Sequence, residues 1–245
     1  MTVASLLKNA VPLSEERHGD HFLNPVKGYA FARDIPVVPA LAREFADLAG
    51  DYVIGFMQTP DGVRAVALLG LGDGENLYLE QDGSWRVAYV PAMLRQFPFV
   101  AMVQKGQSNG VLGIVEDYEG LNKSGQGAPL FDEDGRPGGL VSRAQSFVAD
   151  VAQGALRTDA ICARLADQGL LAPIRADIRN KAGQGRRITG VMAVDRKAFE
   201  ALDGDTLKAL QGEGALEAIY QHLASLRNMR KLVERIEFAP PPVLN

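Results

Sequence analysis

The sequence contains few of the residues that most often form disulfides, metal sites or nucleophilic centres. Among its 245 residues there are one cysteine and three histidines. Because a disulfide needs two thiols, Cys162 cannot form one within the chain, and a cysteine-based zinc site is excluded as well. This cysteine usage is typical of a reducing compartment, so we expect a cytoplasmic protein.

Long apolar runs and an excess of positive charge are also missing. No run approaches the roughly 18 consecutive apolar residues that a transmembrane helix requires. The first twenty residues lack the basic region and the apolar run of a secretory signal. With 26 basic and 30 acidic residues, the formal net charge is −4, which provides no sustained positive field for a phosphate backbone. We therefore predict no membrane span and no nucleic-acid partner.

Several short signatures of common enzymes are absent too. The glycines from Gly70 to Gly74 follow a strand-like run, as in a dinucleotide-binding loop. The residues after them are typical of another strand, and without a helix N-terminus the phosphate-binding fingerprint is incomplete. The sequence has no P-loop lysine or H-E-x-x-H pattern. We expect a protein without a cofactor, and an enzyme remains the competing class.

The sequence does contain a series of short apolar runs separated by turn residues, between residues 51 and 115. Turns such as Asp82-Gly83 and Asn109-Gly110 suit the tight connections of antiparallel strands. We predict an antiparallel β-meander, interrupted by a short helix over residues 91–97, which Pro91 and Pro98 bound. The expected strands are residues 53–57, 63–71, 77–80, 85–89, 100–104 and 111–115.

The segments around this meander predict an α+β fold. Residues 1–36 are punctuated by prolines and are expected to be extended, and residues 41–49 have the spacing of a helix. Residues 106–139, rich in glycine and acidic residues, are expected to form a long surface loop. From Ser142 to Gly169 the spacing indicates a long helix with Cys162 on its buried side. One strand over 186–195 and helices over 198–202, from 205 and over 216–236 complete the chain, with His222 beside the apolar face of the last helix.

This pattern divides the chain into a β-rich part, residues 1–140, and a mostly helical part, residues 141–245. The second part is expected to pack on the first and to add a strand to it, in one compact domain.

His18 and His21 are the only closely spaced pair of good metal ligands. The neighbouring carboxylates of Glu15, Glu16 and Asp20 could complete a site, so one hypothesis is a metal-dependent enzyme that uses His18 and His21. Against it, a third strong ligand at a recognised spacing is missing, and the segment lacks a helical pattern that would align the two imidazoles. The alternative is a hydrogen-bonded or solvated pair.

A second candidate site is formed by Trp85, Tyr89 and Arg95. Trp85 and Tyr89 are four residues apart in an alternating run, so we expect them on one face of the sheet. The turn after Pro91 would bring Arg95 to the same edge. Aromatic faces beside a guanidinium suit a ligand with a carboxylate or an aromatic group, such as an amino acid or a peptide terminus. The alternative is that the aromatic side chains are core.

The chain as a whole resembles the SapC family. It departs from the family pattern at Val53, where many members have a proline. The segments that carry the resemblance are VPLSEERH at 11–18, YAFA at 29–32, EF at 44–45, DYVI at 51–54, VALLGL at 66–71, ENL at 75–77, Trp85, YVPA at 89–92 with Arg95, PF at 98–99, PLFDEDG at 129–135 and LASLRNMRKL at 223–232.

The resemblance implies a role and no chemistry. The family takes its name from an S-layer locus, and its members often lie beside TonB-dependent receptors and flavin-dependent proteins similar to tryptophan halogenases. It is distinct from the like-named peptide-transporter permease. The resemblance therefore implies a cytoplasmic accessory protein for the uptake or modification of a peptide or other imported compound. Its partner would be a small molecule or a peptide, or else a flavoenzyme or receptor bound through the loop at 106–139. No catalytic residues carry over.

Overall fold

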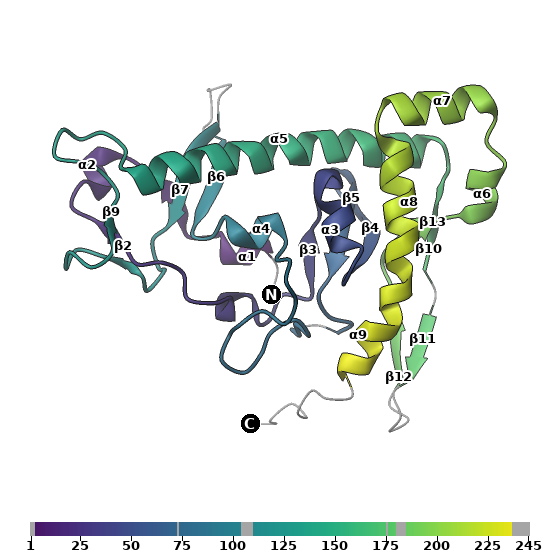
Figure 1. Cartoon of the computed structure of the whole chain (residues 1–245), viewed down its shortest axis with the longest axis horizontal. Coiled ribbons are helices and arrows are strands. Elements are labelled where there is room, and N and C mark those ends of the chain that lie inside the picture. Colours follow the sequence, from purple (N-terminus) through teal and green to yellow (C-terminus); the bar gives the residue numbers. More distant parts are fainter. Residues whose placement is uncertain (1–2, 73, 104–109, 175, 180–184, 237–245) are drawn as a thin grey trace.

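The computed structural model describes residues 3–72, 74–103, 110–174, 176–179 and 185–236. The α+β class is confirmed, since all the paired strands are antiparallel and helices dominate from Gly139 onward (Figure 1). Among the described residues, no helix has the length and apolar character needed to cross a membrane.

The larger sheet is built on the hairpin of β4 (Val53–Thr59) and β5 (Gly62–Leu68). Gly62, with a φ of +117°, allows the tight turn. β3 (Val37–Pro39) pairs with β5, while β13 (Val191–Val194) pairs with β4 and β10 (Leu171–Pro173) with β13. The helical part thus adds two strands to this sheet, where one strand over 186–195 was expected.

The second half of the predicted meander lies in a different sheet. β6 (Phe99–Val103) and β7 (Gly110–Val115) form a hairpin, and β1 (Ala10–Pro12) pairs with β7. Two further sheets are smaller. One has the strand order β8 (Leu121–Asn122), β2 (Phe22–Leu23), β9 (Ala128–Pro129), and the other pairs β11 (Ala176–Arg179) with β12 (Gly185–Ile188). The two hairpins were predicted, but the single continuous sheet was not correct.

The runs 77–80 and 85–89 do not form the expected strands. They are joined by one bridge, between Leu79 and Trp85. Only two backbone hydrogen bonds accompany this bridge in the described structure, from Glu80 N to Ser84 O and from Arg86 N to Tyr78 O. The side chain of Asn76 also binds the backbone here, accepting from Tyr78 N and donating to Ala32 O. Tyr78 is fully buried. The apolar residues therefore pack into the core from a loop, which the alternation alone could not distinguish from a strand.

The long helix α5 (Gly139–Asp167) contacts β5 of the larger sheet and β6 of the other. Figure 1 shows it running along the molecule beside both β regions. It begins before Ser142, whose hydroxyl donates to Gly138 O instead of capping the helix. Gly169 follows its end with a φ of +65°. Cys162 is fully buried, as predicted, and burial raises the pKa of its thiol to about 12.

The remaining helices are short, apart from α8, which packs on β4 and β13. The amino-terminal segment, expected to be extended, contains three helical turns among its described residues, and the helix predicted over 216–236 is divided by a 3₁₀ turn. In chain order they are α1 (Val3–Leu6), α2 (Glu15–His18), η1 (Ala30–Ala32), η2 (Ala42–Glu44), α3 (Phe45–Leu48), α4 (Ala92–Arg95), α6 (Arg196–Glu200), α7 (Gly204–Gly212), α8 (Ala215–Ser225), η3 (Leu226–Asn228) and α9 (Met229–Ile236).

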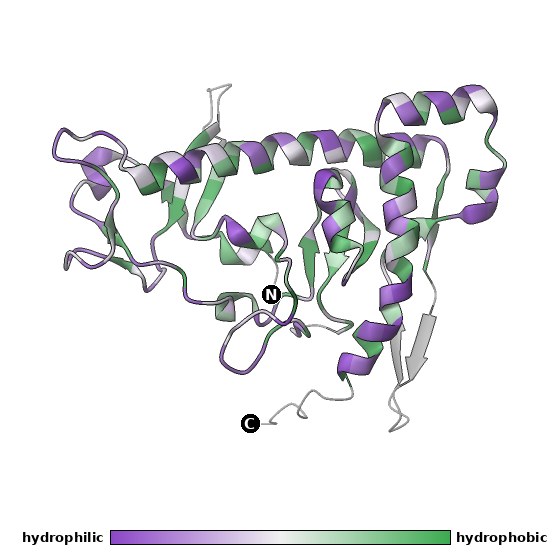
Figure 2. Cartoon of the chain, in the orientation of Figure 1, coloured by the Kyte–Doolittle hydropathy of each residue, from purple (hydrophilic) through white to green (hydrophobic). Residues whose placement is uncertain are grey.

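The two larger apolar clusters among the described residues follow the sheet of β4 and β5 and the sheet of β6 and β7. Figure 2 shows hydrophobic residues concentrated on β3, β4 and β5, and alternating with hydrophilic ones along α5 and α8. A second cluster contains Leu23, Phe99, Ile114, Leu130 and Phe131. The segment predicted as a long surface loop is therefore anchored by Leu130 and Phe131. Its residues 106–109 lie outside the described residues.

Candidate ligand-binding site

Arg95, at the exposed end of α4, lies between two aromatic rings. Its Cζ is 5.2 Å from the ring centroid of Tyr89 and 5.3 Å from that of Phe147. Its Nη2 donates to Tyr89 Oη over 3.1 Å. Within the described part of the chain, no carboxylate is within ion-pair distance of Arg95. The guanidinium is thus held in place while most of its donors remain available.

The buried carboxylate of Glu44 holds the side chain of Tyr89 through a hydrogen bond. Tyr89 Oη donates to Glu44 Oε2 over 2.8 Å, and Ala92 N donates to the same oxygen over 3.0 Å. Leu41 N donates to the other oxygen, Oε1, over 3.0 Å. Three donors satisfy the carboxylate, as a group only 3% exposed requires. Burial and the nearby Glu44 raise the pKa of Tyr89, so the ring under Arg95 is neutral.

Trp85 joins this site through Tyr52. The indole Nε1 donates to Tyr52 Oη over 2.6 Å, and Tyr52 Oη in turn donates to the carbonyl of Tyr89. The half-buried indole stacks on Tyr78, with ring centroids 6.1 Å apart, and meets Tyr29 edge-on at 5.4 Å. The structure therefore brings Trp85, Tyr89 and Arg95 together, by a hydrogen-bonded chain and not by a shared strand face.

Burial explains the protonation of the tyrosines behind the indole. The rings of Tyr52 and Tyr78 stack with centroids 4.4 Å apart, and both are fully buried. Burial raises the pKa of Tyr78 to about 12 and that of Tyr52 further. Tyr78 Oη donates to Asp51 O over 2.8 Å. These neutral rings form a rigid support for Trp85.

Three residues in contact with Trp85, Tyr89 or Arg95 were not predicted: Tyr29, Glu44 and Phe147. Phe147 had the spacing of the core side of α5, yet it is half-buried and its ring lies beside the Arg95 guanidinium. Glu44 could have been noticed as an acidic residue inside an otherwise apolar helical pattern. We call Trp85, Tyr89, Arg95 and Phe147 the arginine site.

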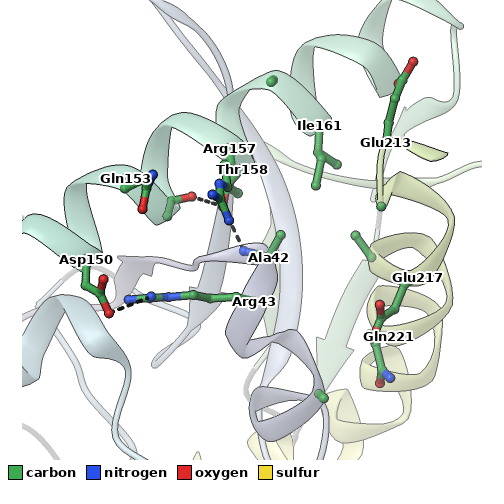
Figure 3. Close-up of a pocket in the computed structure, with 15 residues that line it drawn as sticks. Ala42, Arg43, Asp150, Gln153, Arg157, Thr158, Ile161, Glu213, Glu217 and Gln221 are labelled. Atoms are coloured by element: carbon green, nitrogen blue, oxygen red, sulfur yellow. Dashed lines mark hydrogen bonds and ion pairs between the residues drawn. The ribbon is translucent and has the colours of Figure 1, made fainter. Parts of the chain in front are cut away.

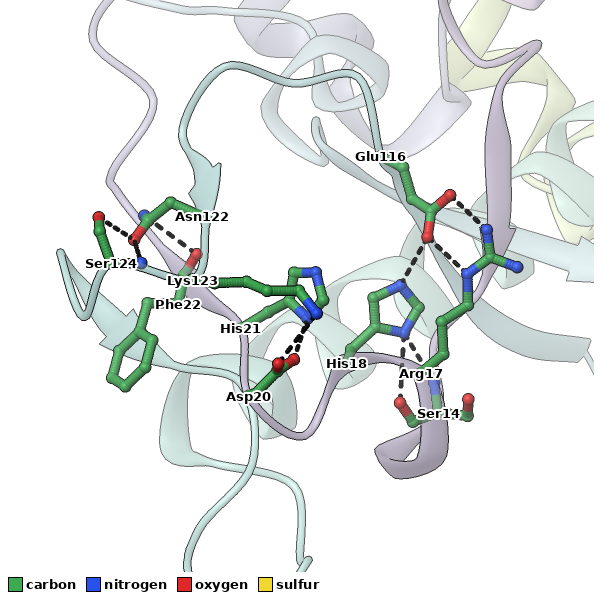
Figure 4. A network of polar contacts seen from close by, with 10 residues as sticks. All are labelled: Ser14, Arg17, His18, Asp20, His21, Phe22, Glu116, Asn122, Lys123 and Ser124. Carbon is green, nitrogen blue, oxygen red and sulfur yellow. Dashed lines mark hydrogen bonds and ion pairs between the residues drawn. The ribbon is translucent and has the colours of Figure 1, made fainter.

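The imidazole of His18 contacts Ser14 and Glu116, as Figure 4 shows. It is fully buried at the end of α2, with Nε2 3.2 Å from Glu116 Oε1 and Nδ1 3.2 Å from Ser14 O. Arg17 holds the same Glu116 through two hydrogen bonds of 2.6 Å. The hydrogen bond from Arg17 lowers the pKa of Glu116, while burial lowers that of His18. Both ring nitrogens of His18 are therefore engaged within the protein.

His21 lies beside His18, with ring centroids 5.4 Å apart in an edge-on arrangement. Its Nδ1 is 2.9 Å from Asp20 Oδ1, without hydrogen-bond geometry, and Lys123 Nζ pairs with the other oxygen of Asp20 at 2.9 Å. In the described ranges, no group of three or more histidine, cysteine or acidic side chains is arranged to hold a metal. This geometry favours the hydrogen-bonded alternative for His18 over a metal-dependent enzyme.

A third polar group is formed by His222, Ser225 and Asn228, spaced three residues apart on α8 and η3. His222 Nε2 accepts from Val194 N over 3.0 Å, and its Nδ1 is 2.9 Å from Ile54 O. The neighbouring hydroxyl of Ser225 accepts from Ile54 N, and Asn228 donates to the carbonyls of Ala49 and Tyr52, each over 2.8 Å. All three side chains are fully buried. We call these three residues the polar clamp.

The comparisons with known proteins agree with the sequence pattern. The SapC family model matches residues 13–232, most of the chain. The protein therefore belongs to the SapC family. No match was found among curated proteins or among solved structures. The matched range contains all three residues of the polar clamp.

Proposed function

We propose that this SapC-family protein is a cytoplasmic accessory protein that binds a small ligand at the arginine site and catalyses no reaction. The ligand carries a carboxylate and an aromatic or other flat apolar group, as the C-terminus of a peptide or an N-acylated amino acid does. Its role would be to hold such a compound during uptake or modification.

The observation that supports this proposal is the state of Arg95. An exposed arginine normally moves freely and pays an entropic cost when it binds an anion. Here the rings of Tyr89 and Phe147 both contact the guanidinium, and Glu44 fixes Tyr89. Because the guanidinium lacks an acidic partner within the described residues, a ligand carboxylate can accept two parallel N–H bonds from it.

Half-buried aromatic rings supply the second part of the recognition. Trp85, Tyr89, Phe147 and Tyr29 are each partly exposed. Trp and Tyr combine a large apolar face with a polar tip, and are typical of binding surfaces for this reason. The site therefore offers one cation with surrounding ring faces, and no nucleophile or general base among these groups. This is the chemistry of recognition and not of catalysis.

The direct test is calorimetric titration with N-acetyl-L-phenylalanine and with its amide, which differ only in the carboxylate. We expect the acid to bind more tightly than the amide by at least about tenfold, the effect of a charged hydrogen bond. Arg95→Gln should remove this preference. Arg196→Gln, at an exposed arginine of α6, should retain it. Equal binding of acid and amide to the unaltered protein would contradict the proposal.

A further inference from the structure

A cleft of about 750 Å³ lies between α5, η2 and the beginning of α8. Its volume falls within the roughly 300–1,000 Å³ of typical small-molecule sites. The residues of the arginine site do not line it. Figure 3 shows α5 on one side and α8 on the other, with Ala42 and Arg43 of η2 between them.

The two helices present different polar side chains to this cleft. Gln153 and Arg157 are four residues apart on α5, and Glu217 and Gln221 are four apart on α8, so each pair lies on one helix face. The base of the cleft is fixed by Thr158, whose Oγ1 accepts from Ala42 N over 2.8 Å and donates to Gly154 O over 2.7 Å. The wall of α5 is thus firmly attached to η2.

Most charges at the edge of the cleft neutralise one another. Arg43 Nη1 pairs with Asp150 Oδ2 at 3.2 Å, and Glu213 Oε2 pairs with Arg164 Nε at 3.3 Å. Two lining charges have no ion-pair partner among the described residues, namely Arg157 on α5 and Glu217 on α8. The cleft therefore has one available cation and one available anion, on opposite walls.

Small apolar residues fill the surface between these charges. The lining includes the apolar residues Ala42, Ala46, Ile161 and Ala218. The side-chain amides of Gln153 and Gln221 also line the cleft, and they form no hydrogen bond with other described residues. Such amides can donate to and accept from a peptide backbone. The volume, the small apolar lining and the separated charges together favour a ligand with two charged ends and a short uncharged middle.

We propose that this cleft binds a short zwitterionic peptide, with its terminal carboxylate at Arg157 and its terminal ammonium at Glu217. This site is separate from the arginine site and does not depend on the function proposed for it. The opposite charges on the two walls also set the direction of the bound peptide.

The test uses trialanine in four forms: with both ends free, N-acetylated, C-amidated, and blocked at both ends. We expect the free form to bind most tightly, and each blocked end to weaken binding by about tenfold, because each removes one charged contact. Binding is measured by calorimetry on the full chain.

Two variants assign the ends separately. Arg157→Gln should remove the preference for a free carboxylate and retain the preference for a free amine, and Glu217→Gln should have the converse effect. Both side chains are exposed, so the melting temperature should be unchanged. Arg196→Gln serves as the matched control.

Three results would overturn the proposal: no binding of free trialanine, equal binding of the free and doubly blocked forms, or retention of both preferences in both variants. The two sites can be distinguished, since Arg95→Gln should leave trialanine binding unchanged. Arg157→Gln should in turn leave binding of N-acetyl-L-phenylalanine unchanged.

Discussion

The polar clamp and the arginine site use polar side chains in opposite ways. In the clamp, His222, Ser225 and Asn228 are fully buried, and they bind backbone atoms of β4, β13 and the turn before β4. In the arginine site, Arg95 is exposed, and its one described hydrogen bond goes to Tyr89. Apart from Asn228 Oδ1, which is buried without a partner, the clamp uses its hydrogen-bonding capacity internally, whereas the arginine site leaves capacity for a ligand.

Because of this difference, we expect changes in the polar clamp to alter the stability of the fold and changes in the arginine site to alter ligand binding. A buried polar group that loses its partner costs free energy of folding, because water cannot replace the partner. An exposed guanidinium that loses its aromatic neighbours costs little stability but is less well positioned for an anion. Variants in the two regions should therefore affect different measurements.

The largest effect is expected from His222→Ala. The change leaves Val194 N and Ile54 O without their partners and opens a cavity beside Phe56, whose ring centroid is 5.0 Å from that of His222. We expect a loss of about 3 to 5 kcal/mol in the free energy of unfolding. Urea denaturation measures it. Tyr220→Ala, at an exposed position of the same helix, should change stability by less than about 1 kcal/mol. Similar losses in both variants would contradict the assignment of the clamp.

The same histidine predicts an acid-dependent loss of stability. Burial lowers the pKa of His222 to about 4 in the folded protein. In the unfolded chain its pKa is about 6.5, so the unfolded state binds a proton first as the pH falls. Stability should therefore decrease between about pH 6.5 and pH 4, by on the order of 3 kcal/mol from this group. His18, whose pKa burial also lowers, acts in the same direction.

Denaturation curves at several pH values measure this effect. His222→Gln should show a smaller decrease over the same interval than the unaltered protein does, because glutamine does not titrate. An unchanged slope would show that other groups cause the acid sensitivity.

A smaller effect is expected from Phe147→Leu, which removes one ring face from Arg95 and keeps an apolar side chain on α5. A cation–π contact of this kind is worth about 0.5 to 1 kcal/mol at an exposed site. The preference for N-acetyl-L-phenylalanine over its amide should therefore fall by roughly two- to fivefold and should not disappear. Calorimetric titration of both probes measures it. An unchanged preference would show that Phe147 does not position Arg95.

Local spacing predicted those elements that depend on local sequence. The two hairpins, the long helix and the burial of Cys162 follow from apolar periodicity and from turn residues such as Gly62. The loop at 77–89 was misassigned because its alternation resembles that of a strand, whereas the two runs meet in a single bridge and Asn76 binds the backbone of Tyr78 and Ala32.

The arginine site was only partly predictable for a different reason. Trp85, Tyr89 and Arg95 lie close together in the sequence, so their proximity could be expected. Glu44 and Phe147 reach them from segments about 50 residues before and after, through contacts that depend on how η2 and α5 pack. Local patterns contain no information on such long-range contacts, and so the support for Arg95 became visible only in the fold.

The central claim, that Arg95 serves binding and not stability, is tested most directly by measuring both properties in Arg95→Gln. Trp85 is the only tryptophan of the chain and belongs to the arginine site, so its fluorescence reports ligand binding there. In a titration with N-acetyl-L-phenylalanine, Arg95→Gln should weaken binding by more than about 1.5 kcal/mol while unfolding stability changes by less than about 0.5 kcal/mol. A variant that loses stability but binds the probe with undiminished affinity would contradict the account.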